Sequence, residues 1–262
     1  MNLDLKGKNA LVCGSTQGIG KAVALELALM GANIILLARN EEQLKKTQAE
    51  LSHNKSQQHA YVCADFTRPE ELKSKIETFV KEQKQIHILI NNTGGPAGGP
   101  LINAELKEFT QIFSNHLLCN HILMQATVEG MKKEKYGRII NIISTSVKQP
   151  IKGLGVSNTI RAAVANWSKT LAGELAPFGI TVNNILPGAT LTGRLTSILE
   201  SKAQKTGHTI EDMKNEMLNE IPMARFASAD EIANAVAFLA SPAASYITGI
   251  NIPVDGGRTG CL

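Results

Sequence analysis

Short apolar runs alternate with amphipathic stretches along the chain, and this alternation constrains the fold more than any other feature. Apolar runs that lack alternating polar residues indicate strands buried on both faces, which is typical of parallel sheets. The runs expected to form strands are 10–13, 34–37, 61–63, 86–90, 139–143, 181–186 and 250–254. The stretches between them place apolar residues at helical spacing. We therefore predict an α/β fold, a single-domain Rossmann-type doubly wound parallel sheet of about seven strands with helices on both faces.

Composition narrows the class of protein further. No shift in composition resembles a linker, so we expect residues 1–262 to form one domain. The net charge of +4 is scattered rather than gathered in a basic block, which argues against a nucleic-acid partner. No apolar run is long enough to span a bilayer, and residues 1–8 do not resemble a signal peptide. The four cysteines lack metal-ligand spacing, so we expect no metal site and reduced thiols in a cytoplasmic protein.

One late segment, residues 191–226, interrupts the alternation. It is polar, contains no expected strand, and carries Met213, Met217 and Leu218 at helical spacing. Insertions beyond the carboxyl ends of strands usually cover the ligand crevice of an α/β sheet. We therefore expect a helical insertion that covers the substrate, with a purely structural helix pair as the alternative.

A glycine-rich turn follows the first expected strand and opens the first expected helix. Gly14 permits a tight turn, Gly18 lets the backbone approach a pyrophosphate, and Gly20 lets helix and strand pack closely. The free N–H groups at the helix N-terminus would then face the negative charge. The position of this turn favours dinucleotide binding over a turn without a ligand.

With this glycine pattern, the chain resembles the short-chain dehydrogenase/reductases, in particular the 3-oxoacyl-[acyl-carrier-protein] reductase-like branch. Asn91-Asn92-Thr93-Gly94 resembles the Asn-Asn-Ala-Gly motif, and Pro187-Gly188 followed by Thr192 resembles the nicotinamide-side loop. Val254-Asp255-Gly256-Gly257 resembles the C-terminal signature. The resemblance covers nearly the whole length and implies an enzyme with a seven-stranded sheet, a bound nicotinamide dinucleotide, and a homotetramer in which residues 241–257 pack between subunits.

The resemblance also implies a set of cofactor contacts. The residues near the pyrophosphate would be Gly14, Gly18, Ile19 and Gly20. Those near the adenosine and the nicotinamide would be Asp65 for the adenine amine, Asn91 for the ribose, Gly94 for backbone clearance, and Pro187, Gly188 and Thr192 for the carboxamide side. For Asp65 the alternative is an aspartate that caps a turn.

The end of the second expected strand bears on the choice of dinucleotide. An acid there would hold the 2′-hydroxyl of NAD, but this chain has Ala38 followed by Arg39. A guanidinium suits the 2′-phosphate, and Ser15 or Thr16 could add a hydroxyl contact. We therefore expect NADP as the cofactor. NAD is the alternative if Arg39 is only a solvated residue or is neutralised by the nearby glutamates.

The resemblance breaks at the catalytic centre. The positions of the catalytic asparagine and serine match Asn115 and Ser144. Where the family has Tyr-x-x-x-Lys, this chain has Ser157 and Arg161. A phenol beside a lysine can pass a proton near working pH, whereas a serine hydroxyl is a much weaker acid and arginine does not give up its proton.

Three hypotheses follow from this centre. The first is an NADP(H)-dependent oxidoreductase that transfers hydride between the nicotinamide and a small-molecule carbonyl or alcohol, with Arg161 stabilising an oxyanion and water or substrate as proton relay. His116 is the one nearby side chain with a suitable pKa, although we expect it to serve in helix packing instead, and Asn158 and Thr159 are weaker candidates. The second is a dinucleotide-binding protein without dehydrogenase activity, and the third is a non-redox reaction on the same scaffold.

Overall fold

Seven strands form one parallel sheet in a computed structural model that describes residues 1–82, 85–96 and 98–261. The strand order is β3-β2-β1-β4-β5-β6-β7, so the direction of winding reverses between β1 and β4. The strands are β1 (Asn9–Cys13), β2 (Asn33–Ala38), β3 (Ala60–Cys63), β4 (Ile88–Asn91), β5 (Gly137–Ile142), β6 (Ile180–Pro187) and β7 (Asn251–Val254). The predicted doubly wound α/β fold is confirmed. A crevice for a ligand is expected where the winding reverses, at the carboxyl ends of β1 and β4.

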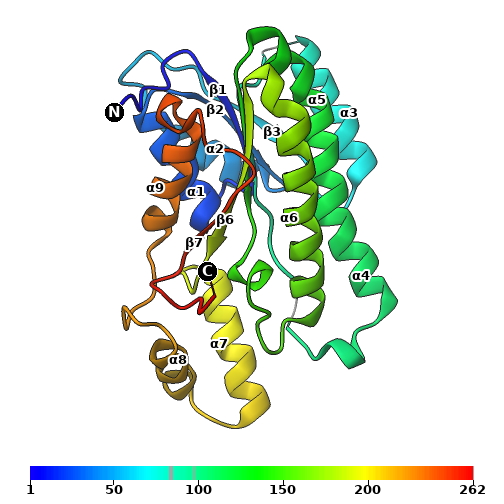
Figure 1. Cartoon of the computed structure of the whole chain (residues 1–262), viewed down its shortest axis with the longest axis vertical. Coiled ribbons are helices and arrows are strands. Elements are labelled where there is room, and N and C mark those ends of the chain that lie inside the picture. The colour runs from blue at the N-terminus through cyan, green and yellow to red at the C-terminus, as the bar shows by residue number, and fades with distance from the viewer. Residues whose placement is uncertain (83–84, 97, 262) are drawn as a thin grey trace.

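Helices cover both faces of this sheet (Figure 1). One face carries α1 (Gly18–Leu29), α2 (Glu41–Ala49) and α9 (Ala229–Ala240). The opposite face carries α3 (Pro69–Glu82), α4 (Leu106–Phe113), α5 (Cys119–Glu134) and α6 (Gly155–Leu175). Helix α9 begins with the capping box of Ser228 and Glu231, which the sequence pattern predicts.

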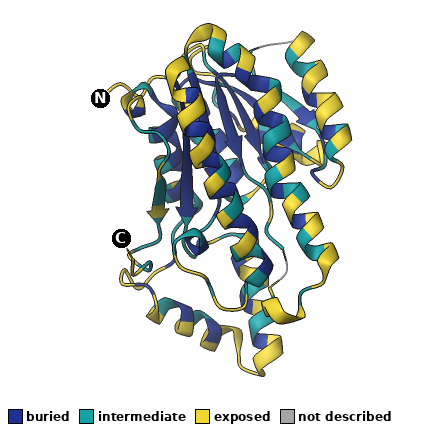
Figure 2. Ribbon diagram, turned by 45° about the vertical axis from the view of Figure 1, so that its right-hand side comes forward, coloured by how far each residue is buried: buried dark blue, intermediate teal, exposed yellow. Residues whose placement is uncertain are grey.

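Successive strand residues feed two separate cores because their side chains point to alternate faces. On β1, Val12 packs into the core beneath α1 and α9, whereas Leu11 packs into the core beneath α3 and α5. The strands are therefore buried from both sides, as Figure 2 shows. This double burial is the physical reason for the unbroken apolar runs in the sequence.

The strands depart slightly from the expected limits. The run expected at 139–143 forms a strand that starts at Gly137, because Arg138 is buried and its backbone N–H donates to His87 O at 3.0 Å. Its guanidinium lies over the Tyr136 ring at 4.4 Å and donates to the Gly137 carbonyl at 2.8 Å. A charged residue thus continues the strand because its polar groups find partners.

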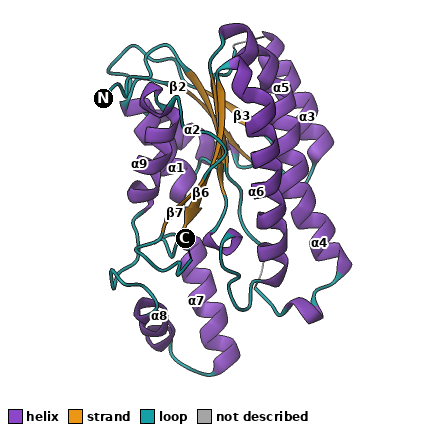
Figure 3. Ribbon diagram, viewed as in Figure 1, coloured by secondary structure: helices purple, strands orange, loops and turns teal. Residues whose placement is uncertain are grey.

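The segment 191–226 forms two helices, α7 (Gly193–Thr206) and α8 (Ile210–Asn219), beyond the carboxyl ends of the strands (Figure 3). They share a small apolar core of their own, made by Leu195, Leu199, Ala203, Met213, Met217, Ile221 and Phe226. The helix pair is therefore an insertion with its own small core, and it is connected to the sheet by the loop after β6.

Candidate active site at the carboxyl edge of the sheet

The glycine-rich turn between β1 and α1 has the conformation that its sequence suggests. Gly14 and Gly18 have φ angles of +59° and +52°, in the left-handed region that favours glycine. A Cβ on Gly20 would lie 2.2 Å from the carbonyl oxygen of Gly14, so no side chain fits there without moving the turn. Asn92, which the sequence analysis did not single out, supports the turn by donating to the Cys13 carbonyl at 3.2 Å.

The loop after β6 closes on this turn. A Cβ on Gly18 would lie 3.2 Å from the methyl group of Thr192, so the glycine-rich turn and the loop after β6 are neighbours at these two residues. A Cβ on Gly188 would lie 2.7 Å from Cα of Asp255, which ties the start of this loop to the C-terminal signature. Ile19 and Thr16 are half-buried beside the turn, and Pro187 ends β6.

Arg39 follows β2 as an exposed side chain. The neighbouring glutamates are engaged elsewhere: Glu41 pairs with Lys45 at 2.9 Å and accepts from the Tyr61 hydroxyl, and Glu42 pairs with Lys46 at 2.8 Å. Within the described part of the chain, Arg39 makes no ion pair. Its guanidinium is therefore available to a phosphate. Ser15, by contrast, is buried and donates its hydroxyl to the Leu37 carbonyl at 3.4 Å.

Asp65 follows β3 and has a local role in the turn. One of its carboxylate oxygens accepts from the backbone N–H of Thr67 at 2.9 Å, the arrangement of an Asx-turn. The side chain remains half-exposed. Asp65 therefore caps the turn, and its contact with the adenine amine stays a prediction. Gly94, after β4, is exposed and would have no heavy atom within 4 Å of an added Cβ.

A ladder of asparagine side chains crosses the sheet, which the sequence analysis missed. Asn91 donates to Asn141 at 2.8 Å, Asn141 donates to Asn184 at 2.9 Å, and Asn184 donates to Asn251 at 2.8 Å. The members sit in register on β4, β5, β6 and β7. A signal was available, since an asparagine stands inside or at the end of four apolar runs. Asn91 is only 2% exposed, and its Oδ1 has no partner among the described residues.

Ser144, Ser157 and Arg161 come from the end of β5 and from α6. The Ser144 hydroxyl accepts from Ser146 N–H at 3.1 Å, which leaves its own hydrogen available to a ligand. Ser157 and Arg161 are four residues apart on α6 and therefore share a helix face. No described residue hydrogen-bonds to the Ser157 hydroxyl.

Arg161 is a buried cation, with 8% of its surface exposed. Its Nη1 donates to the Ile142 carbonyl at 2.9 Å, while its Nε is buried without a partner in the described structure. Burial, and to a lesser extent the charge of Arg194, lower the pKa of Arg161 to about 10. The guanidinium therefore remains cationic at neutral pH.

Asn115 and His116 lie in a π-helical segment, Ser114–Leu118, between α4 and α5. With its amide in the orientation that satisfies both ends, Asn115 donates to the Phe66 carbonyl at 2.9 Å and to the Gln111 carbonyl at 3.2 Å. His116 is 2% exposed and donates from Nε2 to the Gly94 carbonyl at 3.2 Å. Burial, followed by the charge of Arg161, lowers the pKa of His116 to about 2, so the ring is neutral at working pH. His116 is thus a packed, hydrogen-bonded side chain rather than a titrating group.

Helix α7 reaches back to the glycine-rich loop after β4. Arg194 donates to the Pro96 carbonyl, and Lys205 donates to the Gly98 carbonyl at 3.2 Å. This loop, residues 94–100, includes Ala97, which lies outside the described residues. Arg194 carries no signal in the sequence, because its proximity to Arg161, 33 positions earlier on another helix, depends on the fold.

Asn158 and Thr159 have partners on the flank of α6. The Asn158 amide donates to the Ile151 carbonyl at 2.9 Å, and the Thr159 hydroxyl donates to the Gly155 carbonyl at 3.2 Å. Both residues line an open space of about 570 Å³ between α6 and the loop at 146–155. These contacts do not place the Asn158 amide or the Thr159 hydroxyl on the helix face that carries Ser157 and Arg161.

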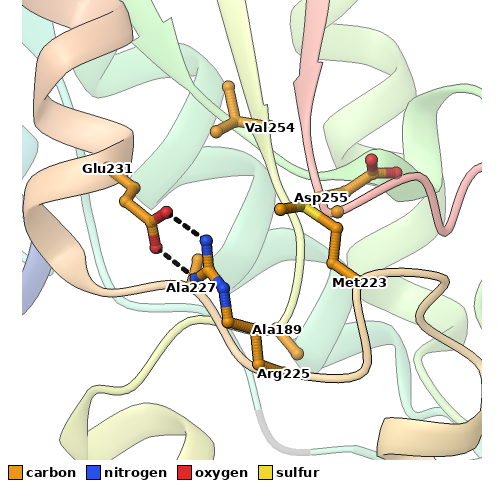
Figure 4. A pocket seen from close by; sticks show the side chains of 8 residues that line it. Ala189, Met223, Arg225, Ala227, Glu231, Val254 and Asp255 are labelled. Atoms are coloured by element: carbon orange, nitrogen blue, oxygen red, sulfur yellow. Dashed lines mark hydrogen bonds and ion pairs between the residues drawn. The ribbon is translucent and has the colours of Figure 1, made fainter.

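The loop after β6 is held in place from its far side, around a small cavity of about 110 Å³ (Figure 4). Thr190 and Ala227 form a bridge between two backbone segments, and the Arg225 guanidinium makes a two-pronged ion pair with Glu231 at 2.6 and 2.7 Å. That pair, with the backbone N–H of Ser228, lowers the pKa of Glu231 to about 2. The contacts fix the segment that carries Thr192 relative to α9.

No helix in the described ranges combines the length and apolar character that crossing a bilayer requires. No group of three or more histidine, cysteine or carboxylate side chains there is arranged to hold a metal ion. The polar groups at the carboxyl edge of the sheet are therefore the candidate active site.

Comparison with known proteins supports the family resemblance. Residues 14–259 match a family model described as enoyl-(acyl carrier protein) reductase. The chain is 32% identical over 251 residues to the NADPH-dependent reductase BacG of Bacillus subtilis, covering 95% of this chain and 97% of BacG. It is 32% identical over 257 residues to the 3-oxoacyl-[acyl-carrier-protein] reductase FabG of Aquifex aeolicus, covering 98% and 99% of the two chains.

A solved structure resembles the fold over its whole length. It is the L-sorbose reductase of Gluconobacter frateurii in complex with NADPH and L-sorbose, with a TM-score of 0.92 and 30% sequence identity. The match covers 100% of each chain. Both the sequence and the fold are therefore similar to proteins described as reductases.

Proposed function

The chain belongs to the short-chain dehydrogenase/reductase family, and we propose that it is an NADPH-dependent reductase that transfers hydride between the nicotinamide and a carbonyl or alcohol carbon. Two similar proteins are described with NADPH, which supports the choice of cofactor. In this chain, the observation that carries the proposal is the buried, cationic Arg161, which shares a helix face with Ser157. Its guanidinium contacts the Ile142 carbonyl at the carboxyl end of β5, the same edge of the sheet that carries the glycine-rich turn.

The residues present fit a dinucleotide. Gly14, Gly18 and Gly20 give a turn whose backbone N–H groups are open to a pyrophosphate at the start of α1. Thr192 sits against that turn, where it would contact the nicotinamide half. The partnerless Oδ1 of Asn91 is a buried acceptor that a ribose hydroxyl would satisfy.

The 2′-phosphate would be held by Arg39, whose neighbouring glutamates are already paired. We expect NADPH to bind at least several-fold more tightly than NADH, because a guanidinium binds phosphate through charge-assisted hydrogen bonds. Titration of the full chain with both dinucleotides measures the preference, and Arg39→Ala should remove it. Lys73→Ala is a control, since it removes an exposed cation that makes no ion pair within the described residues and leaves the partners of Glu41 and Glu42 in place. Equal affinities in the unmodified protein would contradict this assignment.

The chemistry proposed for the centre uses hydrogen bonds and charge rather than a phenol. A bound nicotinamide dinucleotide supplies or accepts the hydride. Ser144 donates its free hydroxyl hydrogen to the substrate oxygen, and Arg161 stabilises negative charge that develops there. Ser157 is too short to reach the position of a phenolic oxygen, so water or a polar group of the substrate fills that space and carries the proton.

The test restores the family's motif. If a missing proton relay limits the enzyme, Ser157→Tyr with Arg161→Lys should raise the reduction of simple ketones by about 10²-fold or more, the usual value of general acid–base catalysis. Each single change is a control, because neither alone rebuilds the pair. NADPH consumption with a panel of ketones provides the measurement.

Two outcomes would contradict the proposal. Rapid reduction of a simple 3-oxoacyl thioester by the unmodified protein, undiminished by Arg161→Ala, would place the proton donor elsewhere. NADPH binding without hydride transfer, in the unmodified protein and in the double variant, would favour a dinucleotide-binding protein or a non-redox reaction.

The proposal extends to the assembly and to the helix pair. We assign to α7 and α8 the covering of the substrate, because side chains of α7 hold the loop after β4. We assign to residues 241–257 a place between subunits of a homotetramer. Tyr246 within this segment is fully exposed in the single chain, which suits a subunit contact.

A further inference from the structure

Two arginine side chains from different elements converge on one point beside the catalytic centre. A Cβ added to Gly95 would lie 3.4 Å from Nη2 of Arg194 and 3.8 Å from Nη2 of Arg161. Arg161 comes from α6 and Arg194 from α7, so the meeting depends on the fold. Each guanidinium is held by a carbonyl oxygen, of Ile142 for Arg161 and of Pro96 for Arg194.

Neither guanidinium is neutralised by the protein. Within the described ranges, no carboxylate forms an ion pair with Arg161 or Arg194, whereas Arg68, Arg225 and Arg258 each pair with a glutamate. Two like charges at short range repel, and Arg194 accordingly helps to lower the pKa of Arg161. The neighbouring ring of His116 is neutral and donates to Gly94, so it adds no negative charge.

The pair also has hydrogen-bond donors to spare. A guanidinium carries five N–H donors, and the carbonyl contacts use few of them. Nε of Arg161 is buried and has no partner among the described residues. Leaving a buried charged donor unsatisfied is costly, and an anion placed between two guanidinium groups would satisfy the donors and remove the repulsion.

We propose that Arg161 and Arg194 bind an anionic group of the substrate, so that the substrate class is a carbonyl compound bearing a carboxylate or a phosphate, such as an oxo acid. This inference rests on the proposed reductase function and adds the substrate's charge to it. The cofactor's pyrophosphate is the other available anion, but a Cβ added to Gly18 in the glycine-rich turn would have atoms of Thr192 and neither arginine within 4 Å. The pair converges at Gly95, on the loop after a different strand.

The experiment compares charged and uncharged probes on the full chain saturated with NADP⁺, which prevents turnover. The probes are 2-oxobutanoate, 3-oxobutanoate and 4-oxopentanoate, each against its primary amide, with binding followed by calorimetry. We expect at least one oxo acid to bind about tenfold or more tightly than its amide, the usual scale for a charge-assisted hydrogen bond. Arg194→Gln should remove that preference, while Lys202→Gln, which removes a cation from the same helix, should preserve it.

Dinucleotide affinity is measured on the same samples, so the two proposals fail in different ways. Equal binding of every oxo acid and its amide, or no binding of any oxo acid, overturns the inference while normal NADPH binding leaves the reductase proposal standing. Loss of NADP⁺ affinity in Arg194→Gln with oxo-acid binding retained would also overturn it, by assigning the arginine to the cofactor phosphates. Failure of the unmodified protein to bind either dinucleotide would overturn the reductase proposal, and this inference with it.

Discussion

Replacing Gly20 by alanine probes how tightly the glycine-rich turn is built. The new Cβ would lie 2.2 Å from the carbonyl oxygen of Gly14 and 2.7 Å from the amide nitrogen of Asn92. The first atom belongs to the backbone, so it cannot rotate away as the end of a flexible side chain would. The oxygen would have to retreat by about 1 Å to regain a C···O separation of about 3.3 Å.

Two opposing free energies set the expected effect on stability. Overpacking costs about 1–3 kcal/mol, and the backbone clash places this substitution near the upper end. Alanine in a helix gains up to about 1 kcal/mol over glycine. The net expectation is a loss of about 2 kcal/mol, which lowers the melting temperature by about 5 °C in a domain of this size.

Gly173→Ala is the matched control. Gly173 lies in α6, is exposed, and would have no heavy atom within 4 Å of an added Cβ. The same chemical change should there stabilise the protein by about 0.5–1 kcal/mol. The two variants should therefore move the melting temperature in opposite directions.

The same displacement should weaken NADPH binding, because the turn's N–H groups would move relative to the pyrophosphate. Loss of one hydrogen bond to a charged group corresponds to about a tenfold or larger rise in Kd. Calorimetric unfolding and fluorescence titration measure the two effects. If Gly20→Ala melted with the wild type and bound NADPH equally well, the turn would not be packed as described.

Two further predictions concern protonation and assembly. The pKa of His116 is about 2 in the folded chain against an ordinary 6.5, so below pH 6.5 only the unfolded state takes up this proton and stability falls as the pH drops. The loss should reach about 2 kcal/mol at pH 5 by urea unfolding, and His116→Gln should reduce it while His208→Gln should not; equal pH slopes for all three proteins would refute the neutral ring. Light scattering at micromolar concentration should give the mass of four chains, and Tyr246→Lys should lower it; a monomeric mass for the unmodified protein would rule out the tetramer.

Sequence patterns predicted the layered fold because the burial of each element leaves a local pattern of apolar residues. Strand runs such as that of β1 are apolar at nearly every position because both faces are covered, and the period of α1 marks its buried stripe. Gly14 and Gly18 indicate a turn because only glycine adopts their backbone angles freely. The relation of Ser157 to Arg161 also follows from the sequence, since four residues of helix place two side chains on one face.

Other features depend on residues far apart in the sequence. The asparagine ladder needs the register of β4, β5, β6 and β7, and register between distant strands is not written in any one run. Glu41 also accepts from the Tyr61 hydroxyl, 20 residues away along the chain, and this contact between α2 and β3 helps to leave Arg39 unpaired. The low pKa of His116 likewise reflects burial that only the packed structure creates.

The catalytic centre shows both sources of information. From the sequence alone we predict that Ser157 and Arg161 stand where the family has its tyrosine and lysine, because the order of the motifs along the chain points to those positions. Only the tertiary structure decided that Arg161 is buried with an unsatisfied Nε, and that Arg194 meets it at Gly95. The physical reason is that desolvation and Coulomb repulsion depend on distances in space, and the packing of α7 against the loop after β4 sets those distances.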